Sequence, residues 1–390
     1  MQRLAVFLDG TWNDEADKTN VWRLSQCVAP MSLDGAVQRH HYVAGVGTKW
    51  HERITGGAVG QGLSSNVIEA YTWLAKHYDW ASAEPDQIYL FGFSRGAYTA
   101  RSVAGLIAVC GLIKPGAPFT VEWLYERYRE RKNRAEPIYK LEYIRDTGQR
   151  ALTEDEEKVL KYSKRVDIHM IGVWDTVGAL GIPWTGMPLV GKQAFYFHNP
   201  NLSKIHRHAF QAMAIDEHRG PYHPTLWTLF APAEESGEPK EVPEMPPLER
   251  CEQRWFAGAH SNVGGGYKGD SLPSAPLGWM QQRATSLGLA FTETFAPDPA
   301  ALNVEPVDSY AKFMWGVYRL VNLGNRYYRP IGIRRKKVKG GWSYPVNETI
   351  DASVFDRCRA DPKYAKENLL EWQRRRGGPR LEQITGVQRA

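Results

Sequence analysis

The sequence predicts an α/β fold in which a doubly wound, mostly parallel sheet carries helical insertions and a C-terminal extension. Strand-like apolar runs alternate with helical patterns up to about residue 300, and this alternation is typical of a parallel sheet. One strand-like run leads directly into a Gly-x-Ser-x-Gly motif and then into a helical run. With 390 residues, of which 43% are hydrophobic, the chain is long enough for a large α/β domain with insertions.

The chain begins with a predicted strand, a helix and a second strand. Residues 4–8 form an apolar run that predicts a buried strand, and a loop follows over 9–13. A helix with Ser64 or Ser65 as its cap is expected to continue to about residue 78, because apolar residues recur there at helical spacing. It leads to a strand over 87–91.

The middle of the chain predicts a helix, a polar insertion and another strand. The helix covers 97–109, and a helical stretch rich in charged residues follows over 121–164. We interpret the segment 116–165 as a cap or insertion that shapes the substrate pocket. The β-branched run 166–173 then predicts a strand.

Three further segments follow before residue 300. Five apolar residues at helical spacing predict an amphipathic helix: Leu202, Ile205, Ala209, Ala212 and Met213. The segment 231–249 is dense in Pro and Glu, which indicates a surface loop. Residues 254–259 predict a short strand. We therefore divide the chain into a catalytic domain over 1–300 and an accessory segment over 301–390 that packs on it.

The motif Gly92-Phe93-Ser94-Arg95-Gly96 lies between a predicted strand and a predicted helix. A serine on such a turn is the nucleophile elbow of an α/β-hydrolase, where the neighbours of the serine must be small and its backbone is strained. The hydroxyl is then exposed, and the backbone N–H of the next residue, Arg95, points at a developing oxyanion.

Two more polar residues are expected to join Ser94 at the carboxyl edge of the sheet. Asp175 and His260 each follow a predicted strand, and the chain order Ser, Asp, His is that of α/β-hydrolases. Ser94 is then the nucleophile, His260 the proton carrier and Asp175 the group that orients His260. For the second oxyanion donor we consider the N–H of Gly10 or Thr11, although these residues are equally compatible with an ordinary turn.

Other chemistry is less well supported by the residues. The four cysteines, Cys27, Cys110, Cys251 and Cys358, are widely dispersed and indicate neither a zinc site nor disulfides, which fits a reducing, cytoplasmic environment. The glycine-rich segment 57–62 lacks the Gly-Lys-Ser/Thr ending of a phosphate-binding loop, so we expect a flexible loop. We predict no cofactor.

Clustered His and acidic residues near the middle of the chain offer no convincing metal site. His206 and His208, two apart on the predicted helix, would point to different faces. Asp216 and Glu217 are expected to hold a loop near the site through a salt bridge to Arg219.

The net charge and the hydropathy pattern of the sequence indicate which partners and which cellular location to expect. The net charge of +6 is modest, and no nucleic-acid-binding module accompanies it, so we predict no nucleic-acid partner. The apolar run at the N-terminus is interrupted by Asp9 before it reaches the length of a signal peptide, and no stretch is long enough for a transmembrane helix. We expect a protein that is cytoplasmic as synthesised.

The segment after residue 300 combines an apolar stripe with basic clusters. The stripe is formed by Phe313, Val317, Leu320 and Val321, and the clusters lie at 334–337 and 374–376 with aromatic residues nearby. Together they predict either a surface that docks on an anionic membrane or a core-packed helix with a solvated basic face.

Several motifs in order along the chain resemble those of the bacterial α/β-hydrolase domain of unknown function 2235, the catalytic domain of type VI secretion phospholipase effectors. The resemblance runs from about residue 3 to 290 and rests on these motifs: Phe7-Leu8-Asp9-Gly10-Thr11-Trp12-Asn13, Gly45-Val46-Gly47-Thr48, Phe91-Gly92-Phe93-Ser94-Arg95-Gly96-Ala97-Tyr98-Thr99-Ala100-Arg101, Gly172-Val173-Trp174-Asp175-Thr176-Val177-Gly178, Ala214-Ile215-Asp216-Glu217-His218-Arg219 and Trp255-Phe256-Ala257-Gly258-Ala259-His260-Ser261-Asn262-Val263-Gly264-Gly265-Gly266-Tyr267.

The resemblance implies an esterase of the phospholipase A kind, with Ser94, Asp175 and His260 at the triad positions. It also implies a phospholipid substrate, export by a type VI system without a cleavable signal, and an immunity or secretion-apparatus protein as partner. The sequence departs from the family at Asn262, where an aspartate is usual. Two alternatives stay open at this point: hydrolysis of a soluble ester, and a binding scaffold with a hydrolase fold.

Overall fold

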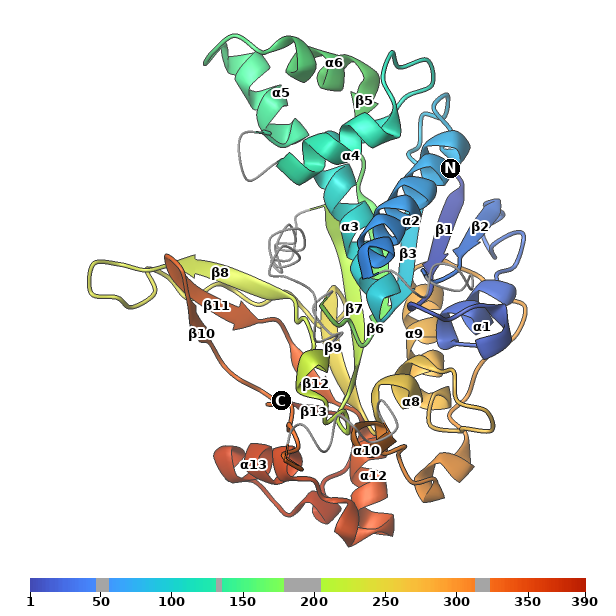
Figure 1. The fold of residues 1–390 in the computed structure, drawn as a ribbon, viewed down its shortest axis with the longest axis vertical. Helices are drawn as coiled ribbons and strands as arrows, with labels where there is room; N and C mark the ends of the chain where they lie inside the picture. Colours follow the sequence, from blue (N-terminus) through green and yellow to red (C-terminus); the bar gives the residue numbers. More distant parts are fainter. Residues whose placement is uncertain (47–55, 131–134, 179–204, 313–322) are drawn as a thin grey trace.

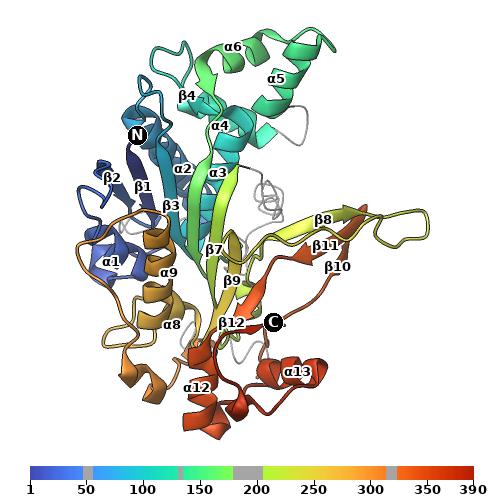
Figure 2. The same ribbon diagram turned by 180° about the vertical axis from the view of Figure 1, so that it is seen from behind.

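The computed structural model describes residues 1–46, 56–130, 135–178, 205–312 and 323–390. Its centre is an eight-stranded sheet, drawn in Figures 1 and 2. The strands, in their order across the sheet, are β13 (Gln388–Arg389), β12 (Glu348–Ile350), β9 (Cys251–Phe256), β7 (His206–Ala214), β6 (Ile168–Trp174), β3 (Gln87–Phe93), β1 (Arg3–Leu8) and β2 (Gln38–Val43).

All neighbouring strands of this sheet are parallel except the edge pair β12 and β13. The parallel strands therefore end at one common edge, where the first residues after β3, β6 and β9 meet. Strands β1, β3 and β6 at the centre of the sheet are buried on both faces, as strands of parallel sheets covered by helices are. The observed architecture confirms the predicted α/β-hydrolase-like fold.

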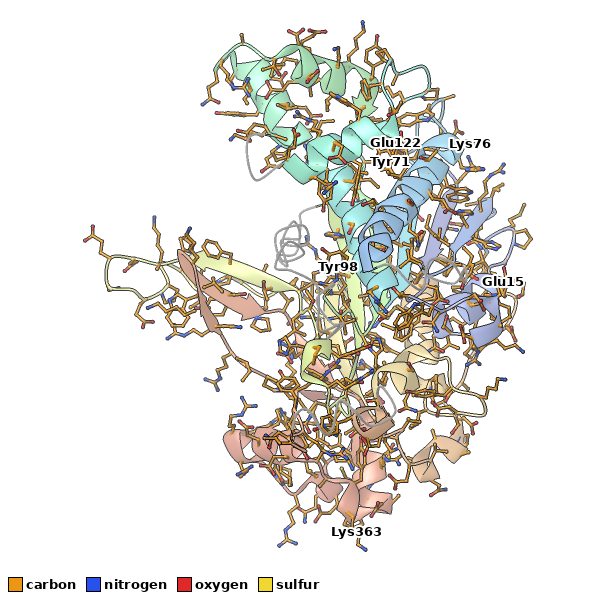
Figure 3. All side chains as sticks on the ribbon, viewed as in Figure 1. Glu15, Tyr71, Lys76, Tyr98, Glu122 and Lys363 are labelled. Atoms are coloured by element: carbon orange, nitrogen blue, oxygen red, sulfur yellow. The ribbon has the colours of Figure 1, made fainter. Side chains whose placement is uncertain are left out.

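Helices cover both faces of the sheet (Figures 1 and 2). On one face α2 (Gly56–His77) and α3 (Arg95–Cys110) pack with the strands in a large apolar cluster. On the other face α1 (Asn20–Gln26) and α9 (Ser274–Ser286) form a second cluster. Figure 3 labels two residues of α2: Tyr71, which is buried and whose hydroxyl donates to the carbonyl of Gly111 at 2.7 Å, and Lys76, which is exposed.

The insertion over 116–165 lies at the opposite edge of the sheet from the predicted triad. It contains α4 (Val121–Arg129), α5 (Ile138–Thr147) and α6 (Glu154–Tyr162), and a small sheet of β4 (Leu112–Ile113) and β5 (Ser163–Lys164) closes its base. It joins the end of α3 to the start of β6, and both of these termini lie at the amino edge (Figure 1). The insertion is therefore helical as predicted, but the expectation that it shapes the pocket around Ser94 is wrong.

The segment after residue 300 completes both sheets. Its strands β12 and β13 extend the main sheet, and β10 (Lys336–Val338) and β11 (Gly341–Pro345) join β8 (Thr228–Pro232) in a three-stranded antiparallel sheet. Its helices α12 (Ala352–Ala360) and α13 (Glu367–Arg376) pack with β9 and β12 in a third apolar cluster. Strands from both sides of residue 300 share one sheet. The predicted division of the chain at residue 300 remains a prediction.

The remaining described elements are short. They are η1 (Glu15–Asp17), η4 (Gly220–Tyr222), α8 (His260–Gly264), η5 (Pro299–Asn303), α10 (Ser309–Lys312), η7 (Pro362–Tyr364) and η8 (Leu381–Gln383). No helix among the described residues is long and apolar enough to cross a membrane.

Two local predictions are wrong. The amphipathic helix predicted through Ala209 and Met213 is strand β7, which lies between β6 and β9 and is buried along most of its length. The glycine-rich segment 57–62 is not a loop, because α2 begins at Gly56, well before Ser64. A Cβ at Gly62 would lie 2.6 Å from a methyl carbon of Val46, so this glycine lets the helix approach the loop after β2.

The basic clusters of the C-terminal segment are largely engaged within the chain. Arg335 pairs with Glu238 at 2.9 Å and stacks on Trp342, and Arg374 pairs with Glu367 at 2.6 Å. Trp372 is buried. The apolar stripe from Phe313 to Val321 lies outside the described residues, so the membrane-docking surface remains a prediction.

Candidate active site

Ser94 lies on the tight turn between β3 and α3. Its backbone has φ 57° and ψ −118°, a conformation that costs a non-glycine residue about 1–3 kcal/mol. The amide of Ser94 donates to the carbonyl of Trp174 at 3.0 Å, which ties the turn to β6. A Cβ at Gly96 would lie 2.1 Å from the carbonyl oxygen of Leu8, so only glycine allows α3 to start this close to β1. The predicted elbow geometry is present.

The three predicted triad residues meet at the carboxyl edge of the sheet. Ser94 Oγ lies 2.7 Å from His260 Nε2, and His260 Nδ1 lies 2.5 Å from Asp175 Oδ2. All three side chains are buried, and Asp175 is fully so. Because an ionised carboxylate only accepts hydrogen bonds, Nδ1 carries the proton and Nε2 is left to accept from the serine hydroxyl. The arrangement can transfer the serine proton to the imidazole.

Asp175 is held at the end of β6 by the neighbouring strand. Its amide donates to the carbonyl of Ala212 at 2.7 Å, and its Oδ1 accepts from the amide of Ala214 at 3.0 Å. The residue has a positive φ of 39°. These contacts with β7 orient the carboxylate toward His260.

Arg329 is a member of the site that the sequence analysis missed. Its Nη1 donates to Asp175 Oδ1 at 2.6 Å, and its Nη2 donates to Asp175 Oδ2 at 3.0 Å. The same nitrogens donate to the carbonyls of Ala214 and Tyr222 at 2.7 and 2.5 Å. The side chain is 0% exposed. The sequence holds no signal for it, because Arg329 lies 154 residues after Asp175 and belongs to no recognisable motif.

The charges around the predicted triad favour ionised Asp175 and neutral His260. Burial alone raises the pKa of Asp175, but the charge of Arg329 and the hydrogen bond from His260 outweigh it and hold the pKa well below its usual range. Burial lowers the pKa of His260, and the hydrogen bond with Asp175 opposes this effect without cancelling it. At neutral pH the imidazole is therefore poised to accept a proton.

A second buried ion pair braces the turn that carries His260. The Glu217 carboxylate accepts from Arg219 Nε and Nη2 at 2.8 and 2.7 Å, from Ser309 Oγ at 3.0 Å and from the amide of His260 at 3.3 Å. The predicted pairing of Glu217 with Arg219 is confirmed. The predicted pairing of Asp216 is wrong, because its carboxylate instead accepts from the amide of Gly258 and the hydroxyl of Tyr364, both at 2.7 Å.

The backbone amides predicted as oxyanion donors differ in whether they already make a hydrogen bond. The amide of Gly10 donates to the Asp9 carboxylate at 2.7 Å, so it is already engaged. Gly10 nevertheless lies against Ser94, since a Cβ on it would be 3.3 Å from Ser94 Cβ. Within the described part of the chain, the amides of Thr11 and Arg95 make no hydrogen bond. These two amides are therefore the better candidates.

Asn262 stabilises the start of α8, the helix that begins at His260. Its Oδ1 accepts from the amides of Ala259 and Val307 at 3.0 and 3.1 Å, and its Nδ2 donates to Asp270 Oδ2 at 2.7 Å. An aspartate here would lack this donor and would face the Asp270 carboxylate. Asn262, which stands where the family usually has aspartate, therefore has a hydrogen-bond acceptor for its side-chain amide in Asp270.

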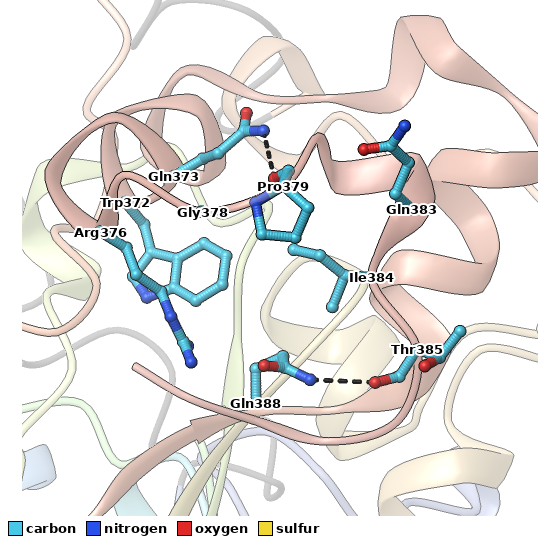
Figure 4. A pocket seen from close by; sticks show the side chains of 9 residues that line it. All are labelled: Trp372, Gln373, Arg376, Gly378, Pro379, Gln383, Ile384, Thr385 and Gln388. Atoms are coloured by element: carbon cyan, nitrogen blue, oxygen red, sulfur yellow. Dashed lines mark hydrogen bonds between the residues drawn. The ribbon is translucent and has the colours of Figure 1, made fainter.

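No group of residues suited to a metal is found in the described ranges. His206 and His208 lie on strand β7 rather than on a helix, and His208 Nδ1 is 3.0 Å from the carbonyl of His169. A separate cavity of about 240 Å³ lies in the C-terminal segment (Figure 4) and contains no predicted triad residue. Its lining is formed by Trp372, Gln373, Arg376, Gly378, Pro379, Gln383, Ile384, Thr385 and Gln388.

The parallel sheet, the helices on both faces and the serine on a strand-to-helix turn define an α/β-hydrolase-like protein. A family model described as the type VI secretion system phospholipase effector Tle1-like catalytic domain matches residues 2–283. The chain belongs to this family. The resemblance drawn from the sequence motifs is thereby confirmed.

Individual relatives are more distant. The uncharacterized protein YEL023C of Saccharomyces cerevisiae is 30% identical over 178 residues, which cover 43% of this chain and 23% of the yeast protein. A crystal structure of an uncharacterized protein from Pseudomonas aeruginosa has 15% identity and a TM-score of 0.39, with coverage of 74% of this chain and 46% of the other. The structure of the Tle1 effector bound to the VgrG spike has 18% identity and a TM-score of 0.32, with coverage of 70% and 52%.

Proposed function

We propose that this protein is a serine esterase of the phospholipase A type, which hydrolyses an acyl ester of a glycerophospholipid. One observation carries the proposal: the Ser94 hydroxyl lies 2.7 Å from His260 and His260 lies 2.5 Å from Asp175, in a chain that belongs to a family of phospholipase effector catalytic domains. This geometry supports Ser94, His260 and Asp175 as nucleophile, general base and orienting acid.

In the first half-reaction Ser94 Oγ attacks the ester carbonyl while His260 Nε2 takes the hydroxyl proton. The resulting oxyanion is stabilised by the backbone N–H groups of Arg95 and Thr11, and each such donor contributes roughly 2.7–4 kcal/mol to lowering a barrier of this kind. His260 then returns its proton to the leaving alcohol oxygen, which departs as the lysophospholipid. Ser94 is left as an acyl ester.

In the second half-reaction a water molecule attacks the acyl-enzyme. His260 Nε2 takes one proton from this water, the oxyanion forms in the same place, and collapse of the intermediate returns the proton to Ser94 Oγ. The products are a fatty acid and the regenerated hydroxyl. Asp175 keeps its negative charge throughout and stabilises the imidazolium that forms in each step.

Family membership also supports a proposal about delivery. We propose that the chain acts as an effector of a type VI secretion system and engages a component of that apparatus, since the family is described by this system. An immunity protein and an anionic membrane remain further predicted partners. A soluble ester is the alternative substrate.

Hydrolysis of mixed-chain phospholipid vesicles tests the proposed function. Purified protein is incubated with vesicles of phosphatidylglycerol or phosphatidylethanolamine that carry a different acyl chain at each position, and the released fatty acids are identified by mass spectrometry. We expect release of one chain in preference to the other, dependent on Ser94. Cleavage of short soluble esters without attack on the vesicles would support the soluble-ester alternative, and silence on both would contradict an esterase.

We expect the enzyme to stay active at pH values below the ordinary pKa of histidine. His260 must be neutral to act as a base, so kcat/KM rises as it loses its proton. Because burial lowers its pKa below the ordinary value of about 6.5, the half-maximal point of the acid limb should fall below that pH. The measurement is kcat/KM for a soluble ester between pH 4 and 9, with folding checked by circular dichroism at each pH. A half-maximal point at or above about 7 would contradict this assignment.

A further inference from the structure

The side chain of Arg95 is a buried cation beside the nucleophile with no anionic partner in the described structure. It is only 7% exposed, and its Nη1 has no hydrogen-bond partner. Its guanidinium carbon lies 5.2 Å from the ring centroid of Trp12, on the loop after β1. Burial lowers the pKa of the guanidinium, yet arginine keeps its charge in proteins.

Two other buried arginines of the site, unlike Arg95, each pair with a carboxylate. Arg219 pairs with Glu217 at 2.7 Å, and Arg329 pairs with Asp175 at 2.6 Å. An isolated charge is costly to bury, whereas a charge that meets an anion with good hydrogen bonds is not. No acidic side chain among the described residues pairs with Arg95, so this position suits an anion supplied by a ligand.

The surroundings of Arg95 are those of an anion site that borders the triad. The residue begins α3, a helix of 16 residues whose N-terminal end favours negative charge. Arg95 directly follows Ser94 in the chain, and Ser94 Oγ lies 2.7 Å from His260 Nε2. Thr11, which precedes Trp12, carries a buried hydroxyl without a hydrogen-bond partner. Two unsatisfied donors thus lie on the two segments that flank Ser94.

We propose that the Arg95 guanidinium and the Thr11 hydroxyl form a subsite for the phosphodiester group of the substrate. This inference rests on the proposed function and adds to it the residues that bind the phosphodiester shared by glycerophospholipids. In such a lipid the phosphate and the acyl esters are attached to one glycerol, so a phosphate held at Arg95 leaves an ester carbonyl within reach of Ser94. The planar guanidinium fork matches two phosphate oxygens.

A matched pair of substrates tests the subsite. Phosphatidylglycerol and diacylglycerol with the same acyl chains are presented in the same neutral detergent micelles, and kcat/KM is measured for wild type, Arg95→Met and Thr11→Val. These substitutions retain the backbone N–H groups at both positions. For Arg95→Met the ratio of phospholipid to diacylglycerol activity is expected to fall about 10- to 100-fold, and for Thr11→Val by a smaller factor.

Arg207→Met is the matched control, because Arg207 is exposed at the amino-terminal end of β7, at the opposite edge of the sheet. It is expected to leave the ratio unchanged. An equal loss on both substrates in Arg95→Met would overturn the proposal, since it would assign the guanidinium to the ester carbonyl. If Arg95→Met does not fold, Arg95→Lys, which keeps the charge but not the fork, is expected to lower the ratio by an intermediate factor, and an unchanged ratio would overturn the proposal.

A binding measurement separates the subsite from the proposed activity. Ser94→Ala protein is titrated by calorimetry with glycerophosphoglycerol, which carries the phosphodiester without acyl chains, and with inorganic phosphate. Binding of the phosphodiester that is lost on adding Arg95→Met supports the subsite even if no ester is hydrolysed. No binding at millimolar concentration, or tighter binding of inorganic phosphate, would overturn it while leaving the esterase proposal intact.

Discussion

Replacing Ser94 with alanine is expected to lower kcat/KM for any ester substrate by on the order of 10⁴-fold or more, because the nucleophile is removed and the residual rate depends on the oxyanion donors and substrate binding alone. The hydroxyl contacts His260 and is not needed by the surrounding core, so the melting temperature should change little. The measurements are hydrolysis of a soluble ester, thermal unfolding, and labelling by a fluorophosphonate, which reacts only with an activated serine.

Ser102→Ala provides a matched control on the same helix. Ser102 is also buried, and its hydroxyl donates to the carbonyl of Tyr98 at 2.8 Å. This variant should keep its activity and its labelling. If Ser94→Ala retained either property, the nucleophile would have to be another residue, and the proposed mechanism would fail.

The second large effect is expected at the buried pair of Asp175 and Arg329. Asp175→Asn should lower kcat by about 10⁴-fold, because the amide leaves His260 in the wrong tautomer. It also leaves Arg329, which is 0% exposed, without its counter-charge. Breaking a buried pair from one side typically costs about 3–5 kcal/mol of folding free energy, and the same cost is expected for Arg329→Met. Urea unfolding measures both.

The double variant Asp175→Asn/Arg329→Met separates stability from catalysis. Removing both charges avoids the unpaired one, so most of the lost stability should return. Activity should not return, because the orienting carboxylate is still missing. A double variant as unstable as the sum of the two single variants would show that the pair does not couple, and would contradict the account of Arg329 given above.

Arg329→Met by itself tests whether the arginine acts on His260 through Asp175. Its charge offsets part of the attraction between the carboxylate and the imidazolium, so removing it should raise the pKa of His260 and move the acid limb of kcat/KM to higher pH. An acid limb at the wild-type pH, in a variant that still folds, would assign Arg329 a purely structural role.

The sequence predicted well wherever local pattern and tertiary structure agree. The run at 4–8 is strand β1, and the run at 87–91 is most of β3, because both are apolar on both faces and end at glycine or polar residues. The elbow could be placed because the serine, its glycines and the change of period occur within a few residues. The family could be identified because its motifs are long and lie in order.

The wrong predictions occurred where tertiary contacts overrule local preference. β7 is covered on both faces, so its small and apolar residues do not alternate and were interpreted as a helix. The glycines before Ser64 indicated a loop, but close packing against Val46 places them inside α2. The insertion was expected at the pocket, because sequence order does not show at which edge of a sheet a connection lies.

The sequence by itself determined the fold class, the family and the three residues proposed as the triad, because each of these depends on motifs that are contiguous in the chain. Only the tertiary structure decided which groups surround them. Arg329 reaches Asp175 from a segment outside the family match, and Arg95 is buried with no counter-charge among the residues that the structure describes. Pairing and burial depend on residues that are distant in sequence, and folding alone brings them within hydrogen-bonding distance.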